Sequence, residues 1–180
     1  TTVWVPGPDK PHYMPGTNPV MLKLVVDTKT RKLIGAQGVG PGDVDKRIDA
    51  AAVAITAGMT VDQIAKLDLC YAPPFSPAMD NLITAADVAR NKLDGQMIGI
   101  SAAEVHEKIK RGDDFLFLDV RSPAEYEAVR LPNSTLIPLG ALRKKVAELP
   151  REKEIVTFCA VSLRGYEAAL ILRAAGFENV

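Results

Sequence analysis

The sequence predicts two domains in series: an α+β domain with a small antiparallel sheet plus helices, followed by an α/β domain with a parallel sheet. Residues 1–95 hold two alternating apolar segments separated by a short polar turn, which is typical of an antiparallel hairpin. Residues 97–180 alternate apolar runs with helical patterns, as in a sheet whose parallel strands are joined by helices. We expect the boundary in the polar segment Leu93–Gln96.

The strands of the first domain are predicted from alternation. Val20–Asp27 places apolar residues at every second position, and Lys32–Val39 returns after the polar turn Thr28–Thr30. Val3–Val5 supplies a third strand. Helical patterns then run from about residue 44 to residue 55, from Thr60 to Leu67 with a capping box at its start, and from about Met79 to Lys92.

Three glycines, Gly38, Gly40 and Gly42, allow two interpretations. A dinucleotide-binding loop needs a different spacing and a following strand–helix–strand pattern. We therefore favour a strand-to-helix turn in which Asp43 caps the helix. One face of that helix should carry the apolar residues Val44, Ile48, Ala51, Ala52 and Ile55.

The second domain begins with a capping box, Ser101–Glu104, which predicts a helix with Val105 and Ile109 turned inward. Phe115–Leu118 is a continuous apolar run, as expected of a buried parallel strand. Further helices are predicted after the cap at Ser122, around Leu139, Leu142 and Val146, and from Gly165 to Ala175.

Cys159 is the candidate catalytic residue. The strand Ile155–Phe158 runs directly into it, and a helix is predicted after Arg164. At such a turn the sulfur faces the unpaired N–H groups of a helix start, which together with the guanidinium favour thiolate, the nucleophilic form. The alternative is a small buried hydrophobe, the commoner role of a lone cysteine. Neither His12 nor His106 is placed to serve as a base or a metal ligand, so no metal site is predicted.

These motifs resemble those of a rhodanese-type sulfurtransferase domain. Leu118–Tyr126 matches the LDVR-x-P-x-E-[YF] motif of that family, and Cys159–Arg164 matches the ends of its six-residue active loop, with Ala160, Val161, Ser162 and Leu163 between them. The resemblance implies that the cysteine carries a persulfide cradled by the N–H groups of the loop. Asp119 and Arg121 end a neighbouring strand there, and for them we favour bracing of the loop by hydrogen bonds over direct chemistry. Related cysteine-dependent phosphatases have a loop one residue longer, so this tighter ring suits sulfur better than phosphate.

Three departures from the family's pattern set further expectations. Ser162 stands where the family often has glycine, so we expect a strained, glycine-like conformation there. Val129-Arg130 replaces the usual Gly-His before Ser134. The chain ends at Val180, where a complete domain of this kind would add a last strand, a GG turn and a helix. The predicted rhodanese-like domain, residues 97–180, is therefore expected to be C-terminally incomplete, without an edge strand and its cover.

Composition excludes several classes of function. Basic and acidic residues number 22 each, with no basic run, so neither nucleic acid nor an anionic membrane is an expected partner. No apolar run approaches the length of a membrane span. Two cysteines in unrelated contexts predict no disulfide and suit a reducing cytoplasm. The start Thr1–Val5 resembles the middle of a strand, so we expect a piece of a longer protein.

The first domain resembles the dimerisation domain of flavin-dependent pyridine nucleotide-disulfide oxidoreductases, on the motifs HYMPG, VGPGDVDKRIDA and LDLCYAPPFSPAMD. The most similar branch holds the coenzyme A (CoA) disulfide reductases and their NADH oxidase relatives, some of which carry a fused rhodanese domain. The resemblance implies a homodimer in which Tyr71 and Tyr13 reach the partner's redox-active cysteine and its substrate. Cys70 has no basic neighbour, so we expect it to be buried and inert.

The leading hypothesis is therefore the C-terminal part of a reductase of CoA disulfide, CoA persulfide or polysulfide, with a rhodanese domain that carries sulfane sulfur. FAD, NAD(P)H and CoA are implied for the intact enzyme. No dinucleotide fingerprint is present, so this chain alone is expected to hold none of them. Two alternatives remain open: an inactive rhodanese fold that serves as an interaction module, and a unit that only dimerises.

Overall fold

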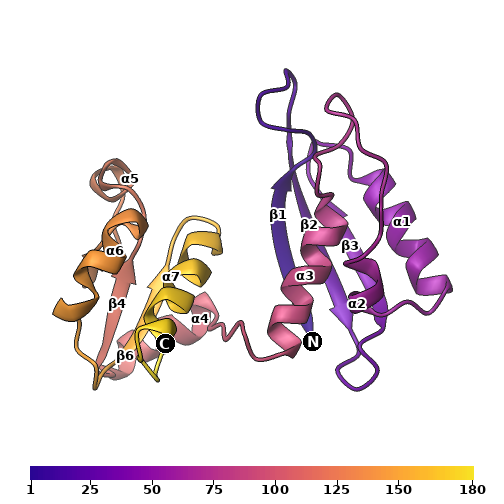
Figure 1. The fold of residues 1–180 in the computed structure, drawn as a ribbon. Coiled ribbons are helices and arrows are strands. Elements are labelled where there is room, and N and C mark those ends of the chain that lie inside the picture. Colours follow the sequence, from indigo (N-terminus) through magenta and orange to yellow (C-terminus); the bar gives the residue numbers. More distant parts are fainter. The chain divides into compact units, whose positions relative to one another are not determined.

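The computed structural model describes all 180 residues and divides into two compact units, Thr1–Met97 and Ile98–Val180. Figure 1 shows an antiparallel three-stranded sheet with helices in the first unit and a parallel three-stranded sheet with helices in the second. These two architectures confirm the fold class predicted from the sequence.

The sheet of the first unit has the strand order β1 (Thr2–Pro8), β2 (Pro19–Val26) and β3 (Leu33–Val39). Alternate residues of β2 are buried, as the period of a strand requires, and the register places Val5 opposite Leu22 on this buried face. On the opposite face the ammonium of Lys23 lies 5.0 Å from the ring centre of Trp4, a cation–π contact.

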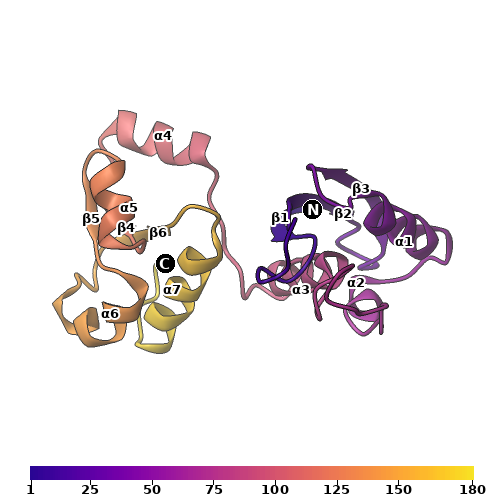
Figure 2. The ribbon, with the colours of Figure 1, turned by 90° about the horizontal axis from the view of Figure 1, so that it is seen from above.

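Three helices cover the buried face of this sheet: α1 (Asp45–Thr56), α2 (Val61–Ile64) and α3 (Asn81–Leu93). Figure 2 shows all three on the same side of the strands. The predicted capping box of Thr60 and Gln63 starts α2. Asp80 caps α3 by accepting a hydrogen bond of 2.9 Å from the N–H of Leu82. Helix α3 buries the residues predicted for its inner face, Leu82, Ala85, Ala86 and Ala89.

The start of α1 differs from the prediction. The helix begins at Asp45, and its first turn receives no side-chain cap, so Asp43 is not the cap expected from the sequence. The carbonyl of Asp43 instead accepts a hydrogen bond of 2.8 Å from Arg47. Because this arginine is buried, the inner face of α1 is rotated toward it, and Ala52 is exposed rather than inward.

The glycines before α1 permit close packing of the chain against itself. A Cβ atom at Gly38 would overlap the side chain of Val44, and one at Gly40 would overlap the carbonyl of Pro19. Gly40 also has φ +145°, which favours glycine. These glycines thus let the turn between β3 and α1 pack closely against the chain, in keeping with the strand-to-helix turn that the sequence favoured.

The second unit contains the following elements in chain order: α4 (Ala102–Arg111), β4 (Phe115–Asp119), α5 (Pro123–Ala128), β5 (Ser134–Leu136), α6 (Leu139–Lys145), a 3₁₀ turn (Val146–Glu148), β6 (Glu154–Phe158) and α7 (Leu163–Ala174). The strands pair in the order β5-β4-β6 and are parallel. Asp119 lies in register with Phe158, so β4 and β6 end at the same edge.

The core of this unit lies between the sheet and helices α6 and α7, which run along one face in Figure 2. Leu118, Leu142, Ile155, Ala168 and Leu172 are its most deeply buried members. Helix α4 differs from the prediction, since Ile109 is 44% exposed. The side of α4 near the sheet carries Lys108 instead, whose ammonium bonds to Glu154 at 2.6 Å.

Candidate functional site

The end of β6 positions Cys159. The strand continues through Phe158, as predicted, and Cys159 is the first residue beyond the carboxyl edge of the sheet. Open α/β sheets place their ligands at this edge. The cysteine is a half-buried free thiol that packs against the core of the second unit. Its sulfur therefore has both a fixed position and access to solvent.

The active loop, residues 159–164, reverses direction at Ser162. This serine has φ 71° and ψ −25°, the left-handed conformation that the sequence led us to expect, and its side chain does not cap α7. The helix begins at Leu163, so Arg164 lies within its first turn rather than before it. The backbone N–H groups of residues 160–165 donate to no other backbone group. Together they form a donor-rich turn that can accommodate an anion.

Arg164 is clasped by Glu125. Its two terminal nitrogens donate to the two carboxylate oxygens at 2.8 and 2.7 Å, a bidentate pair. The carboxylate is held in place because it also accepts a 2.9 Å bond from the N–H of Ser122, which closes the cap of α5. Arg164 keeps the pKa of Glu125 far below its usual range, and Glu125, with a smaller contribution from Cys159, raises the pKa of Arg164.

This ion pair was missed by the sequence analysis, in which Glu125 appeared only as part of the motif Leu118–Tyr126. The two residues are 39 positions apart, so no local pattern joins them.

Asp119 and Arg121 form a second ion pair beside the loop. Asp119 is fully buried and binds the guanidinium of Arg121 at 2.6–3.0 Å, so the pair raises the pKa of Arg121. Arg121 also donates to the carbonyl of Val129 at 2.8 Å and lies 5.9 Å from the ring centre of Phe158. The pair thus contacts Phe158, the residue before Cys159. Bracing of the loop itself stays a prediction.

Thr157 and Gly165, which the sequence analysis did not single out, hold α7 against β6. The hydroxyl of Thr157 donates to the carbonyl of Gly165 at 2.8 Å. A Cβ atom at Gly165 would lie 3.3 Å from both the Cα of Phe158 and the carbonyl oxygen of Thr157, closer than ordinary packing. The absence of a side chain lets the helix start approach the strand that carries the cysteine.

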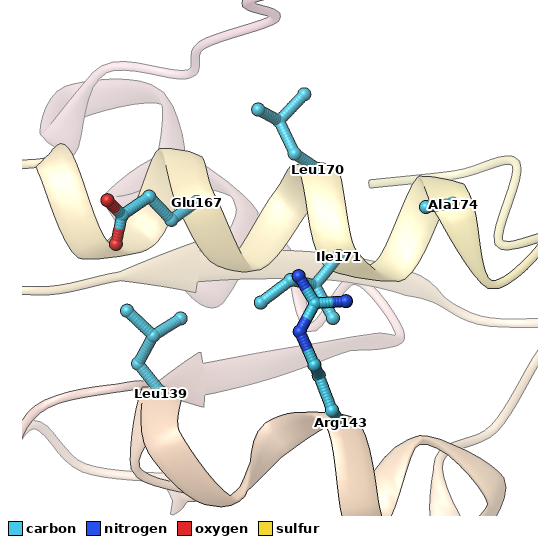
Figure 3. A pocket seen from close by; sticks show the side chains of 6 residues that line it. All are labelled: Leu139, Arg143, Glu167, Leu170, Ile171 and Ala174. Atoms are coloured by element: carbon cyan, nitrogen blue, oxygen red, sulfur yellow. The ribbon is translucent and has the colours of Figure 1, made fainter.

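The outer side of the loop is apolar. Val161 and Leu163 are 56% and 62% exposed, and they flank Ser162. A separate open hollow lies between α6 and α7 (Figure 3), where Leu139 and Arg143 face Glu167 and Ile171. None of its lining residues belongs to the active loop.

The first unit brings its two candidate tyrosines together. The hydroxyl of Tyr71 interacts with that of Tyr13 and raises the pKa of Tyr13. Both side chains are exposed, by 50% and 63%. Cys70, next to this pair, is exposed as well, so the expectation of a buried thiol is wrong. Its neighbour Leu69 packs against the core of the unit, whereas Cys70 itself faces solvent.

A buried arginine holds the two tyrosine segments. The guanidinium of Arg47 donates to the carbonyls of Asp43 and Asp9 at 2.8 and 2.9 Å. Its Nε lies 3.0 Å from the carboxylate of Asp80, an ion pair without hydrogen-bond geometry. Ser76 completes the cluster by donating to Asp80 at 3.1 Å. Arg47 therefore contacts both segments, at Asp9 before Tyr13 and at Asp80 after Tyr71.

Neither unit contains a group of three or more His, Cys, Asp or Glu side chains arranged to hold a metal ion. None of the helices is long and apolar enough to cross a membrane.

Comparisons with known proteins assign a family to each unit. Residues 2–83 match the pyridine nucleotide-disulphide oxidoreductase dimerisation domain, and residues 101–180 match the rhodanese-like domain. The NAD(P)H sulfur oxidoreductase (CoA-dependent) of Pyrococcus furiosus is 46% identical over 89 residues, which cover 49% of this chain and 20% of that protein. The coenzyme A disulfide reductase of Staphylococcus aureus is 39% identical over 69 residues, which cover 38% of this chain and 16% of that protein.

Two solved structures extend the similarity to nearly the whole chain. The NAD-dependent persulfide reductase from A. fulgidus is 49% identical with a TM-score of 0.88, over 100% of this chain and 32% of that one. The reduced CoADR-RHD of Bacillus anthracis is 35% identical with a TM-score of 0.91, over 98% and 31%. The chain thus spans about a third or less of these relatives. With residues 2–83 it belongs to the pyridine nucleotide-disulphide oxidoreductase dimerisation domains, and with residues 101–180 to the rhodanese-like domains.

Proposed function

We propose that the chain is the C-terminal part of a flavin-dependent enzyme that uses NAD(P)H to reduce CoA persulfide, CoA disulfide or polysulfide, in a reducing compartment such as the cytoplasm. Within it, Cys159 carries sulfane sulfur as a persulfide. The observation that supports this role is the position of the sulfur at the carboxyl edge of β6, beside a turn of unpaired N–H groups closed by Arg164. The activities for which the relatives are named supply the substrate class.

The proposed chemistry is a nucleophilic displacement at sulfur. The Cys159 thiolate attacks the outer sulfur of a donor R–S–SH, a new S–S bond forms, and the donor's S–S bond breaks. The leaving sulfur takes the electron pair and the proton, so the products are R–SH and the anion Cys–S–S⁻. The N–H groups of residues 160–165 would stabilise the charge on the terminal sulfur.

FAD and NAD(P)H would supply the electrons for the later reduction. The chain's own glycine-rich segment does not fit either cofactor, because Gly38 and Gly40 are in close contact with Val44 and Pro19. We therefore assign both cofactors to the part of the enzyme outside this chain.

Sulfur transfer can be measured directly on this chain. A thiosulfonate serves as donor and cyanide as acceptor, and thiocyanate is the product measured. We expect Cys159→Ser to abolish transfer and Cys70→Ser to preserve it. A folded wild-type protein that transfers no sulfur would refute the carrier role and favour the interaction module.

The tyrosine pair carries the dimer part of the proposal. We place Tyr71 and Tyr13 at the partner's redox-active cysteine in a homodimer, because both are exposed and held together. Tyr71→Phe should leave folding intact and slow NAD(P)H-dependent reduction in the full-length enzyme. Mixing this variant with a subunit that lacks the redox cysteine should form heterodimers with one intact site, so activity partly returns. Heterodimers without restored activity would refute a role across the subunit boundary.

A further inference from the structure

The Glu125–Arg164 pair determines the charge of the active loop. When Cys159 is ionised, the cysteine, Arg164 and Glu125 together carry one net negative charge, and without Glu125 they would carry none. The second guanidinium near the loop, that of Arg121, is neutralised in the same way by Asp119. Neither Arg164 nor Arg121 therefore adds a net positive charge that would attract an anion to the loop.

The ion pair also engages N–H groups of Arg164 that could otherwise bind an oxyanion. A guanidinium recognises sulfate or phosphate oxygens with two parallel N–H groups. In Arg164 one such pair, made by the two terminal nitrogens, already donates to Glu125. The two side chains remain 33% and 35% exposed, so the pair lies where a donor molecule would enter. Val161 and Leu163, the exposed apolar residues of the same loop, add no cation.

We propose that Glu125 is a specificity-determining residue that discriminates against doubly charged oxyanion donors by occupying Arg164. Donors in which the group bonded to the sulfane sulfur is uncharged are accepted. This inference rests on the proposed persulfide role of Cys159. Glu125 does not touch the reacting sulfur. It acts through Arg164, which lies beside Cys159, by neutralising its charge and engaging its N–H donors.

Two small donors that differ mainly in charge test the inference. Thiosulfate, a dianion, gives up its outer sulfur to the Cys159 thiolate and leaves as sulfite. Methanethiosulfonate, a monoanion, does the same and leaves as methanesulfinate, so in both reactions one S–S bond breaks as another forms. In Glu125→Gln the ratio of kcat/KM for thiosulfate to that for methanethiosulfonate should rise about three- to tenfold, as expected for one unit charge at a partly exposed site. Added salt should shrink this difference.

Matched variants separate charge from helix structure. Ser122→Ala weakens the cap of α5 but keeps the Glu125–Arg164 pair, so the donor ratio should stay at the wild-type value. In the double variant Glu125→Gln, Arg164→Gln the freed guanidinium is gone, so the gain in the ratio should disappear. An equal gain in Ser122→Ala, or a gain that survives removal of Arg164, would overturn the inference.

Protection by sulfate provides a second readout that needs no sulfur transfer. Iodoacetamide should alkylate Cys159, and sulfate bound in the loop should slow this reaction. Glu125→Gln should lower the sulfate concentration for half-protection about three- to tenfold. An unchanged concentration contradicts the role of Glu125 whether or not sulfur is transferred. Failure of sulfur transfer from both donors, with sulfate protection altered as expected, would count against the carrier role of Cys159 alone and support the charge role of Glu125.

Discussion

Ser162 offers a sharp test of the loop geometry, because it is a serine in the left-handed conformation, with φ 71°. That conformation costs a non-glycine residue about 1–2 kcal/mol. Its side chain makes no cap bond to α7, so little is lost with the hydroxyl. Glycine adds some chain entropy to the unfolded state, which leaves a net stabilisation of about 0.5–1 kcal/mol for Ser162→Gly. For a domain of this size the Tm should rise by about 2–8 °C.

Thermal unfolding followed by circular dichroism measures this shift. Ser162→Ala is the matched control, since alanine removes the hydroxyl but keeps the Cβ atom and the strain. Asn133→Gly, at another left-handed position with φ 62°, should gain less, because asparagine tolerates this conformation better than serine does. Sulfur transfer should also increase in Ser162→Gly. A lower Tm in that variant, or an equal gain in Ser162→Ala, would show that the hydroxyl rather than the backbone matters.

Three further expectations follow from the structure. Iodoacetamide should alkylate Cys159 faster than the more exposed Cys70 at neutral pH, as peptide mass spectrometry would show, and equal or inverted rates count against the sulfurtransferase. The stability that wild type holds over Glu125→Gln should persist from pH 7 to pH 5 and shrink below about pH 4.3, because the carboxyl has a lowered pKa in the folded state; urea unfolding at each pH tests this. Arg47→Met should destabilise the first unit by about 3–5 kcal/mol, since it leaves the buried carboxylate of Asp80 without its cation, whereas surface Lys23→Met should cost about 0.5 kcal/mol or less in the same urea assay.

Local patterns predicted the elements better than their connections. The alternation of β2 and the inner face of α3 could be read directly, because each depends on neighbours a few positions away. The partners of Arg47 and Arg164 could not, since each joins groups about 30–40 residues apart. Long side chains reach across such separations only after the backbone has folded. For the same reason the exposure of Cys70 depends on the path of its loop and not on its neighbours in sequence.

The cluster around Arg47 makes two surface segments one cooperative unit. Its guanidinium donates to the carbonyl of Asp9, the residue after β1, and is paired with the carboxylate of Asp80, which caps α3. If either segment opened, it would leave a buried charge without its partner, so local fraying of one should entail opening of the other. Amide hydrogen exchange around Tyr13 and around Tyr71 would then follow a single opening reaction. The tyrosine pair would be present or lost as a whole, without half-formed states.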